Sequence, residues 1–256
     1  MKRVVTALLL IPFFCYIVLW APPWAFLGTV AAVAVLCFRE YSQLAALHGI
    51  GKPGLFGYVA GLLLLLLPGK DGAFFVLIAI LAMSLALRSR AMARALPDAA
   101  ALLLGVAYVF GSLRCGIELR AISQYWLFFA LSLNWAGDIA ALYVGRMFGR
   151  HKLAPNVSPA KSWEGSIGSA VASVIYGGLY LPRLLPAVPL AKALGLTVLA
   201  NIAGQLGDLC ESAMKRGAGV KDSGNLLPGH GGWLDRLDSS LFALPVVYFV
   251  VSNFGW

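Results

Sequence analysis

Long, uncharged apolar runs recur from one end of the chain to the other, and they constrain its fold more than any other feature. A helix needs about 20 mainly apolar residues to cross the hydrocarbon core of a bilayer. Only 12% of the 256 residues are charged, about half the share found in soluble domains. The sequence therefore predicts an all-α, polytopic integral membrane protein. About nine transmembrane helices are expected, near 4–20, 24–38, 55–67, 73–87, 99–113, 125–143, 166–181, 190–209 and 234–251.

The distribution of basic residues supports this count. With a cytoplasmic N-terminus and nine alternating spans, 15 of the 20 Lys and Arg residues fall on the cytoplasmic side, as the positive-inside rule requires. The apolar run after Lys2-Arg3 is longer than a signal-peptide core of about 7–15 residues, and no Ala-x-Ala cleavage site follows it. We therefore expect an uncleaved first span.

Two other classes of protein are disfavoured by the composition. The net charge of +9 could indicate a nucleic-acid partner, but the cations are spread between apolar runs and form no basic face. The four cysteines are isolated, and no Cys-x-x-Cys or Cys/His pair indicates zinc. No nucleic acid and no zinc site are expected.

No repeat or linker divides the sequence, so residues 1–256 are interpreted as one membrane domain with two unequal halves. Residues 1–130 are nearly bare of polar groups inside the apolar runs and form a hydrophobic helical scaffold. Residues 131–256 form the catalytic half, because they contain Asn134, Asp138, Glu164, Asp208, Glu211, Asp222, Asp235 and Asp238.

The first polar group spans residues 134–165. Asn134 and Asp138 lie four residues apart and share a helix face, and an Asp at the end of a span needs a wet cavity or a partner. The next loop carries four cations, Arg146, Arg150, Lys152 and Lys161. These suit a phosphate, or equally anionic lipid head groups. Ser158 before Pro159 predicts the start of the seventh helix.

The second polar group, residues 205–238, is the stronger signal. One helix stripe combines carboxylates, a hydroxyl and a lysine: Gln205, Asp208, Glu211, Ser212 and Lys215. A loop follows with Arg216, Lys221, Asp222, Gly229, His230, Gly231 and Gly232, and a new helix opens with Asp235, Arg236 and Asp238.

These residue types together indicate phosphoryl or nucleotidyl transfer. Carboxylates without Cys or paired His select hard cations such as Mg²⁺, and neighbouring Lys and Arg suit phosphate oxygens. Metal and cations would then neutralise the charge that spreads in the transition state, while glycines let backbone N–H groups approach a phosphate. A set of mutually neutralising ion pairs is the weaker alternative. A lone His such as His230 is more often a hydrogen-bonded loop residue than a catalyst.

Several motifs resemble the signature of the phosphatidate cytidylyltransferases, also called CDP-diacylglycerol synthases. The motifs are Ser158-Pro159-Ala160-Lys161-Ser162-Trp163-Glu164-Gly165, Gly207-Asp208-Leu209-Cys210-Glu211-Ser212, Ser212-Ala213-Met214-Lys215-Arg216, Lys221-Asp222, Leu227-Pro228-Gly229-His230-Gly231-Gly232 and Asp235-Arg236-Leu237-Asp238. The similarity covers residues 134–165 and 201–240. It implies CTP and phosphatidate as substrates, CDP-diacylglycerol and pyrophosphate as products, and a bacterial inner-membrane enzyme whose active site faces the cytoplasm. It also implies Mg²⁺, with a monovalent cation such as K⁺ as a further candidate, and often a homodimer.

The resemblance also suggests roles for individual residues. The metal ligands expected are Asp138, Asp208, Asp235 and Asp238. The expected catalytic residues are Lys215, Arg216, Lys221, Asp222, His230 and Arg236, and those expected to bind the nucleotide are Lys161, Ser212, Gly231 and Gly232.

Two rival functions stay open at this point. A related CTP-dependent membrane enzyme, such as a polyprenol kinase or an archaeal lipid cytidylyltransferase, would share much of the chemistry. A transporter should carry paired polar residues in both halves, and the bare first half disfavours that alternative.

Overall fold

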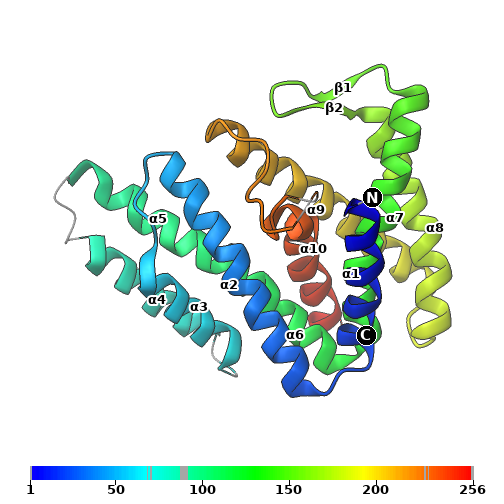
Figure 1. Ribbon diagram of the computed structural model, residues 1–256. Coiled ribbons are helices and arrows are strands. Elements are labelled where there is room, and N and C mark those ends of the chain that lie inside the picture. The colour runs from blue at the N-terminus through cyan, green and yellow to red at the C-terminus, as the bar shows by residue number, and fades with distance from the viewer. Residues whose placement is uncertain are drawn as a thin grey trace. The chain divides into compact units, whose positions relative to one another are not determined.

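The computed structural model describes residues 2–67, 69, 71–86, 92–227, 229 and 231–254. Their fold is mainly helical (Figure 1). The helices are α1 (Lys2–Leu19), α2 (Pro23–Leu47), α3 (Gly54–Leu66), α4 (Asp71–Ala86), α5 (Ala95–Gly105), α6 (Ser112–Ile122), α7 (Gln124–Phe148), α8 (Trp163–Leu184), α9 (Leu190–Gly217) and α10 (Leu234–Asn253). A 3₁₀ turn (Met92–Arg94) precedes α5, and a π-helical segment (Val106–Gly111) joins α5 to α6.

The expectation of an all-α membrane protein is confirmed, because every predicted apolar run coincides with helix. Among the residues described above, four helical stretches are long and apolar enough to cross a bilayer: Pro23–Leu47, Met92–Ile122, Gln124–Phe148 and Leu190–Gly217. Others are shorter. The 13 residues of α3 extend about 20 Å at 1.5 Å per residue, less than the roughly 30 Å of a hydrocarbon core. The count of nine spans therefore stays a prediction.

The chain forms two compact units, each with segments from both sides of residue 130, and the single domain with a scaffold half and a catalytic half stays a prediction. Unit 1 contains Met1–Pro12, Ala21–Arg114 and Gly217–Arg236. Unit 2 contains Phe13–Trp20, Cys115–Arg216 and Leu237–Trp256. The loop that carries much of the predicted signature thus packs with helices of the first half.

Unit 1 is organised around buried aromatic side chains of α2. The Phe38 ring lies 4.9 Å from that of Tyr58 and 5.2 Å from that of Phe110, centroid to centroid. Gly61 and Gly105 leave room for these rings, since a Cβ at either position would collide with Phe110 or Tyr41. Large rings set against glycines let α2, α3 and α5 approach closely.

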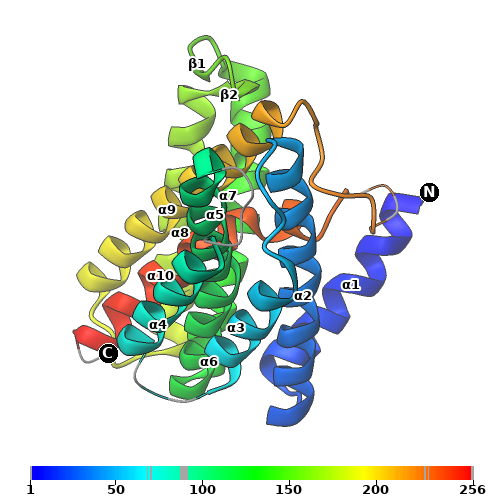
Figure 2. The ribbon, with the colours of Figure 1, turned by 90° about the vertical axis from the view of Figure 1, so that its left-hand side faces the viewer.

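Unit 2 is organised around α7 and α8, which run side by side in both views (Figures 1 and 2). Small residues permit the approach, because a Cβ at Gly165 or Gly168 would press on α7. A polar network joins α8 to α9. Asn201 Nδ2 donates to Ser169 Oγ at 3.0 Å and to Ser173 Oγ at 2.9 Å. In lipid the hydrophobic effect does not drive helices together, so close packing and hydrogen bonds between helices stabilise their association.

The segment between α7 and α8 corrects one expectation. The seventh helix does not begin at Ser158. Residues of β1 (Lys152–Ala154) and β2 (Ser158–Ser162) pair as an antiparallel hairpin, and α8 begins at Trp163 with Ser162 as its N-cap. The Ser162 hydroxyl accepts the Gly165 N–H at 3.1 Å. Strand pairing satisfies the backbone before that point, so the helix starts four residues later. Figure 2 shows the hairpin beyond the ends of α7 and α8.

Candidate active site

Within unit 2, the predicted carboxylate Asp238 interacts with two other predicted carboxylates. Asp138 lies on α7, Asp208 on α9 and Asp238 on α10. The Asp238 carboxylate interacts electrostatically with those of Asp208 and Asp138, and with the ammonium of Lys215. Such like charges are unfavourable unless a cation compensates them. Asp238 is thus electrostatically linked to two of the other expected metal ligands, which lie on separate helices.

The hairpin delivers a cation to this group. Lys161 on β2 places its Nζ 2.5 Å from Asp208 Oδ2. The neighbouring Ser212 hydroxyl donates to Asp208 Oδ1 at 3.3 Å. Asp208 is thus held from one side by a strand and from the other by its own helix. The predicted nucleotide-binding residues Lys161 and Ser212 meet at a predicted metal ligand.

The end of α9 carries the next two predicted residues. Lys215 is largely buried and forms an ion pair with Glu211, one turn earlier and fully buried. Arg216 is exposed, and its Nε donates to the Val157 carbonyl in the hairpin at 3.3 Å. The stripe expected from residue spacing is therefore confirmed as one face of a helix that leaves the apolar part of unit 2.

The donor chemistry of this group fits a hard cation. Asp138, Asp208 and Asp238 offer only carboxylate oxygens, which Mg²⁺ prefers. Within the ranges described above, however, no three His, Cys, Asp or Glu side chains converge into a ready-made ligand set. The Lys161 ammonium compensates the charge of Asp208 instead.

The second group of predicted residues belongs to unit 1, where residues 217–236 run along α2. A Cβ at Gly217 would meet the His48 ring, and a Cβ at Gly224 or Gly232 would meet the Glu40 carboxylate. The loop glycines are therefore needed for close approach to α2. Contact with this helix was not expected from the sequence.

Glu40 is the residue that holds the loop. Glu40 is 1% exposed, yet both of its carboxylate oxygens accept hydrogen bonds. Oε1 accepts the Trp233 N–H at 3.1 Å, and Oε2 accepts the Leu234 N–H at 2.8 Å and the Ser223 hydroxyl at 3.0 Å. Two of these donors belong to the start of α10, so Glu40 caps that helix from α2 and complements its dipole.

Asp235 closes the loop from the other side. Its Oδ2 accepts the Ser223 N–H at 2.9 Å and the Gly232 N–H at 2.7 Å. The same oxygen lies 2.9 Å from Ser223 Oγ, whose single proton is shared between Asp235 and Glu40. Gly231, at φ +80°, leaves space for this carboxylate. These bonds give Asp235 a role in ordering the loop, and its role as a metal ligand stays a prediction. The same holds for the phosphate contacts expected of Gly231 and Gly232.

The remaining predicted residues of this loop lie at its surface. Lys221, Asp222 and Arg236 are exposed, and the catalytic roles expected of them stay predictions. His230 lies outside the described residues.

A further acid–base pair supports the hairpin. The Glu164 carboxylate accepts from His151 Nδ1 at 2.6 Å and from the His151 backbone N–H. The hydrogen bond from the His151 side chain lowers the pKa of Glu164 to about 2. This contact fixes the base of the hairpin whose Lys161 reaches Asp208.

Sequence reasoning did not identify Glu40. A lone carboxylate just after an apolar run was a usable signal, because such a group needs a partner. Its hydroxyl donor, Ser223, is 183 residues away, and no local pattern predicts a contact over that separation.

Comparison with known proteins identifies the family of this chain. The family model described as "Cytidylyltransferase family" matches residues 1–254. The chain belongs to the cytidylyltransferase family. It is 34% identical to the phosphatidate cytidylyltransferase of Bacillus subtilis strain 168, over 99% of this chain and 98% of the relative. It is also 36% identical to the phosphatidate cytidylyltransferase of Staphylococcus aureus strain COL, over 84% of this chain and 85% of the relative.

Proposed function

We propose that this cytidylyltransferase converts CTP and phosphatidate into CDP-diacylglycerol and pyrophosphate. The observation that carries the proposal is the group formed by Asp138, Asp208 and Asp238 with Lys161 and Lys215 beside it. Carboxylates for a metal next to ammonium groups for phosphates are what nucleotidyl transfer needs. Relatives named phosphatidate cytidylyltransferase, matched over most of their length, support the choice of substrates.

The proposed reaction is a direct displacement. A phosphate oxygen of phosphatidate forms a bond to the α-phosphorus of CTP, and the bond from that phosphorus to the β-phosphate oxygen breaks. Pyrophosphate leaves with the electron pair of that bond. No covalent enzyme intermediate is required, because positioning and electrostatic stabilisation supply the catalysis. Lys161 is the proposed partner of the triphosphate beside Asp208, and a catalytic role of Lys221 on its exposed loop stays a prediction.

Mg²⁺ is proposed as the metal, held by Asp138, Asp208 and Asp238. When bound, it would withdraw electrons from phosphate oxygens and stabilise the charge on the leaving group. A monovalent cation such as K⁺ and a homodimer also remain proposals, which metal titration and light scattering of the purified protein would test.

Activity of the purified protein tests the function directly. With radiolabelled CTP, phosphatidate and Mg²⁺, we expect lipid-soluble CDP-diacylglycerol, and a chelator should abolish its formation. Formation of a phosphorylated polyprenol instead would favour a kinase. Failure to label any lipid would refute the proposal.

We also propose that the site faces the cytoplasm of a bacterial inner membrane, where CTP is made. The bias of cations towards one side supports this orientation, and bacterial relatives support the compartment. Single cysteines introduced near residues 92, 155 and 220 should react with an impermeant maleimide only after the cytoplasmic side is opened. Labelling of position 220 from outside would refute the orientation.

A further inference from the structure

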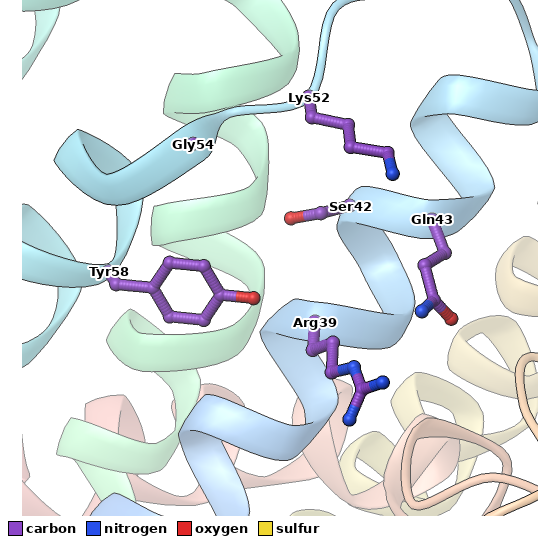
Figure 3. Close-up of a pocket in the computed structure, with 6 residues that line it drawn as sticks. All are labelled: Arg39, Ser42, Gln43, Lys52, Gly54 and Tyr58. Carbon is purple, nitrogen blue, oxygen red and sulfur yellow. The ribbon is translucent and has the colours of Figure 1, made fainter.

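A small cationic cavity lies in unit 1, and none of its lining residues belongs to the proposed catalytic group. It has a volume of about 320 Å³ and is lined by Arg39, Ser42, Gln43, Lys52, Gly54 and Tyr58. Figure 3 shows Arg39, Ser42 and Gln43 on α2, Lys52 on the connection that precedes α3, and Tyr58 on α3. Arg39, Ser42 and Gln43 follow helical spacing on α2, one face away from Glu40.

The lining of this cavity is cationic. The six described residues that line it include two cations and no carboxylate, and no described carboxylate forms an ion pair with Arg39 or Lys52. Arg39 acts electrostatically on the Tyr58 hydroxyl instead. The positive-inside rule accounts for cations at this end of α2. It does not account for their convergence with an amide and two hydroxyl groups on one cavity.

The rim of the cavity is held in place by bonds of its own. The Asp98 carboxylate accepts the Gly51 N–H at 2.7 Å, and the Arg94 guanidinium donates to the Gly49 carbonyl. The connection between α2 and α3 turns through Gly49 and Gly54, both at positive φ. Lys52 therefore projects from an anchored segment.

The surface beside the cavity is apolar. Leu55, Phe56 and Val59 follow directly on α3, and all three side chains are exposed. In a membrane protein such a surface faces acyl chains. A lipid bound in the cavity would contact the cations with its head group and the apolar side chains with its acyl chains.

We propose that this cavity binds the phosphate of an anionic phospholipid. Arg39 and Lys52 supply the charge, and the Gln43 amide and the Tyr58 hydroxyl supply hydrogen bonds. The proposal does not depend on the reaction above, since none of these residues belongs to the proposed catalytic group.

Lipid binding by the purified full chain in detergent tests the proposal. Dioctanoyl phosphatidylglycerol is a suitable probe because it carries one phosphate and is not a substrate of the proposed reaction. We expect Arg39→Gln/Lys52→Gln to raise its Kd about tenfold or more, as loss of two charge-assisted contacts does. The charge-conserving Arg39→Lys/Lys52→Arg protein should bind within about threefold of the unmodified chain.

A matched control separates this site from general attraction. Arg183→Gln/Lys192→Gln removes the same charge from exposed positions of unit 2 and should change the Kd less than about twofold. Equal loss in both double variants, or no loss in either, would overturn the proposal.

Inorganic phosphate and CTP supply the last comparison. If Arg39→Gln/Lys52→Gln weakens their binding and leaves that of the lipid unchanged, the cavity is a site for soluble phosphates.

Discussion

Replacing Glu40 by Gln is expected to loosen the loop 217–236. The substitution preserves the shape of the side chain and removes its charge. An amide has one acceptor oxygen, so at least one of the bonds to Trp233 N, Leu234 N and Ser223 Oγ is lost. Each bond to a charged acceptor contributes about 1.5–3 kcal/mol, and the start of α10 loses about 0.3–1 kcal/mol of dipole stabilisation. We estimate a cost of about 2–4 kcal/mol.

Glu40→Gln is expected to destabilise the loop rather than stabilise it, because three groups donate hydrogen bonds to Glu40. A buried carboxylate without partners would be better replaced by a neutral group. Glu40 accepts two backbone N–H groups and shares the Ser223 hydroxyl with Asp235, so removing its charge weakens favourable bonds. A cost of about 2–4 kcal/mol raises the population of the open loop by roughly 30-fold to 1000-fold.

Limited trypsin digestion measures this population, because Lys221 is an exposed cleavage site on the loop. In Glu40→Gln we expect cleavage after Lys221 to accelerate at least about tenfold, and kcat/KM for CTP to fall at least about tenfold. Glu118→Gln on α6 serves as the matched control and should change neither. Unchanged cleavage in Glu40→Gln would refute the capping argument. Faster cleavage with an unchanged rate of reaction would show that an ordered loop is not needed for turnover.

Three further predictions concern charged residues of the site and the hairpin. Asp235→Asn and Asp238→Asn should each lower turnover by about 10²-fold or more, but only Asp235→Asn should also speed cleavage after Lys221; normal rates in both at saturating Mg²⁺ would make them structural residues. Lys221→Met should lower kcat rather than raise KM, because an exposed loop residue is positioned late; recovery of kcat in the double variant with Asp222→Asn would show that Lys221 only neutralises Asp222. Glu164 has a lowered pKa of about 2, so its contribution to hairpin stability is full above the unfolded value near 4.3. It should be lost between about pH 4.3 and 2. Hydrogen exchange of the hairpin amides, corrected for the intrinsic rate, would then rise over that range, and an identical rise in Glu164→Gln would contradict the assignment.

Local sequence was sufficient wherever neighbours along the chain decide the structure. Apolar runs predicted the helices, because a helix in lipid satisfies its own backbone. Helical spacing placed Asp208, Ser212 and Lys215 on one face of α9, since residues three, four and seven apart in a helix always share a face. The motifs of the second half indicated nucleotidyl transfer, because each motif is a run of neighbouring residues that can be read directly from the sequence.

The tertiary structure decided the contacts between residues that lie far apart in the sequence. Glu40 meets a loop 183 residues later in the chain, and the Arg39–Lys52 cavity exists only because α2 and α3 pack beside each other. Lys161 reaches Asp208 through a hairpin that strand pairing forms in place of the expected helix start. Each of these contacts depends on the packing of complete helices, and a buried polar group takes whichever partner that packing brings near it.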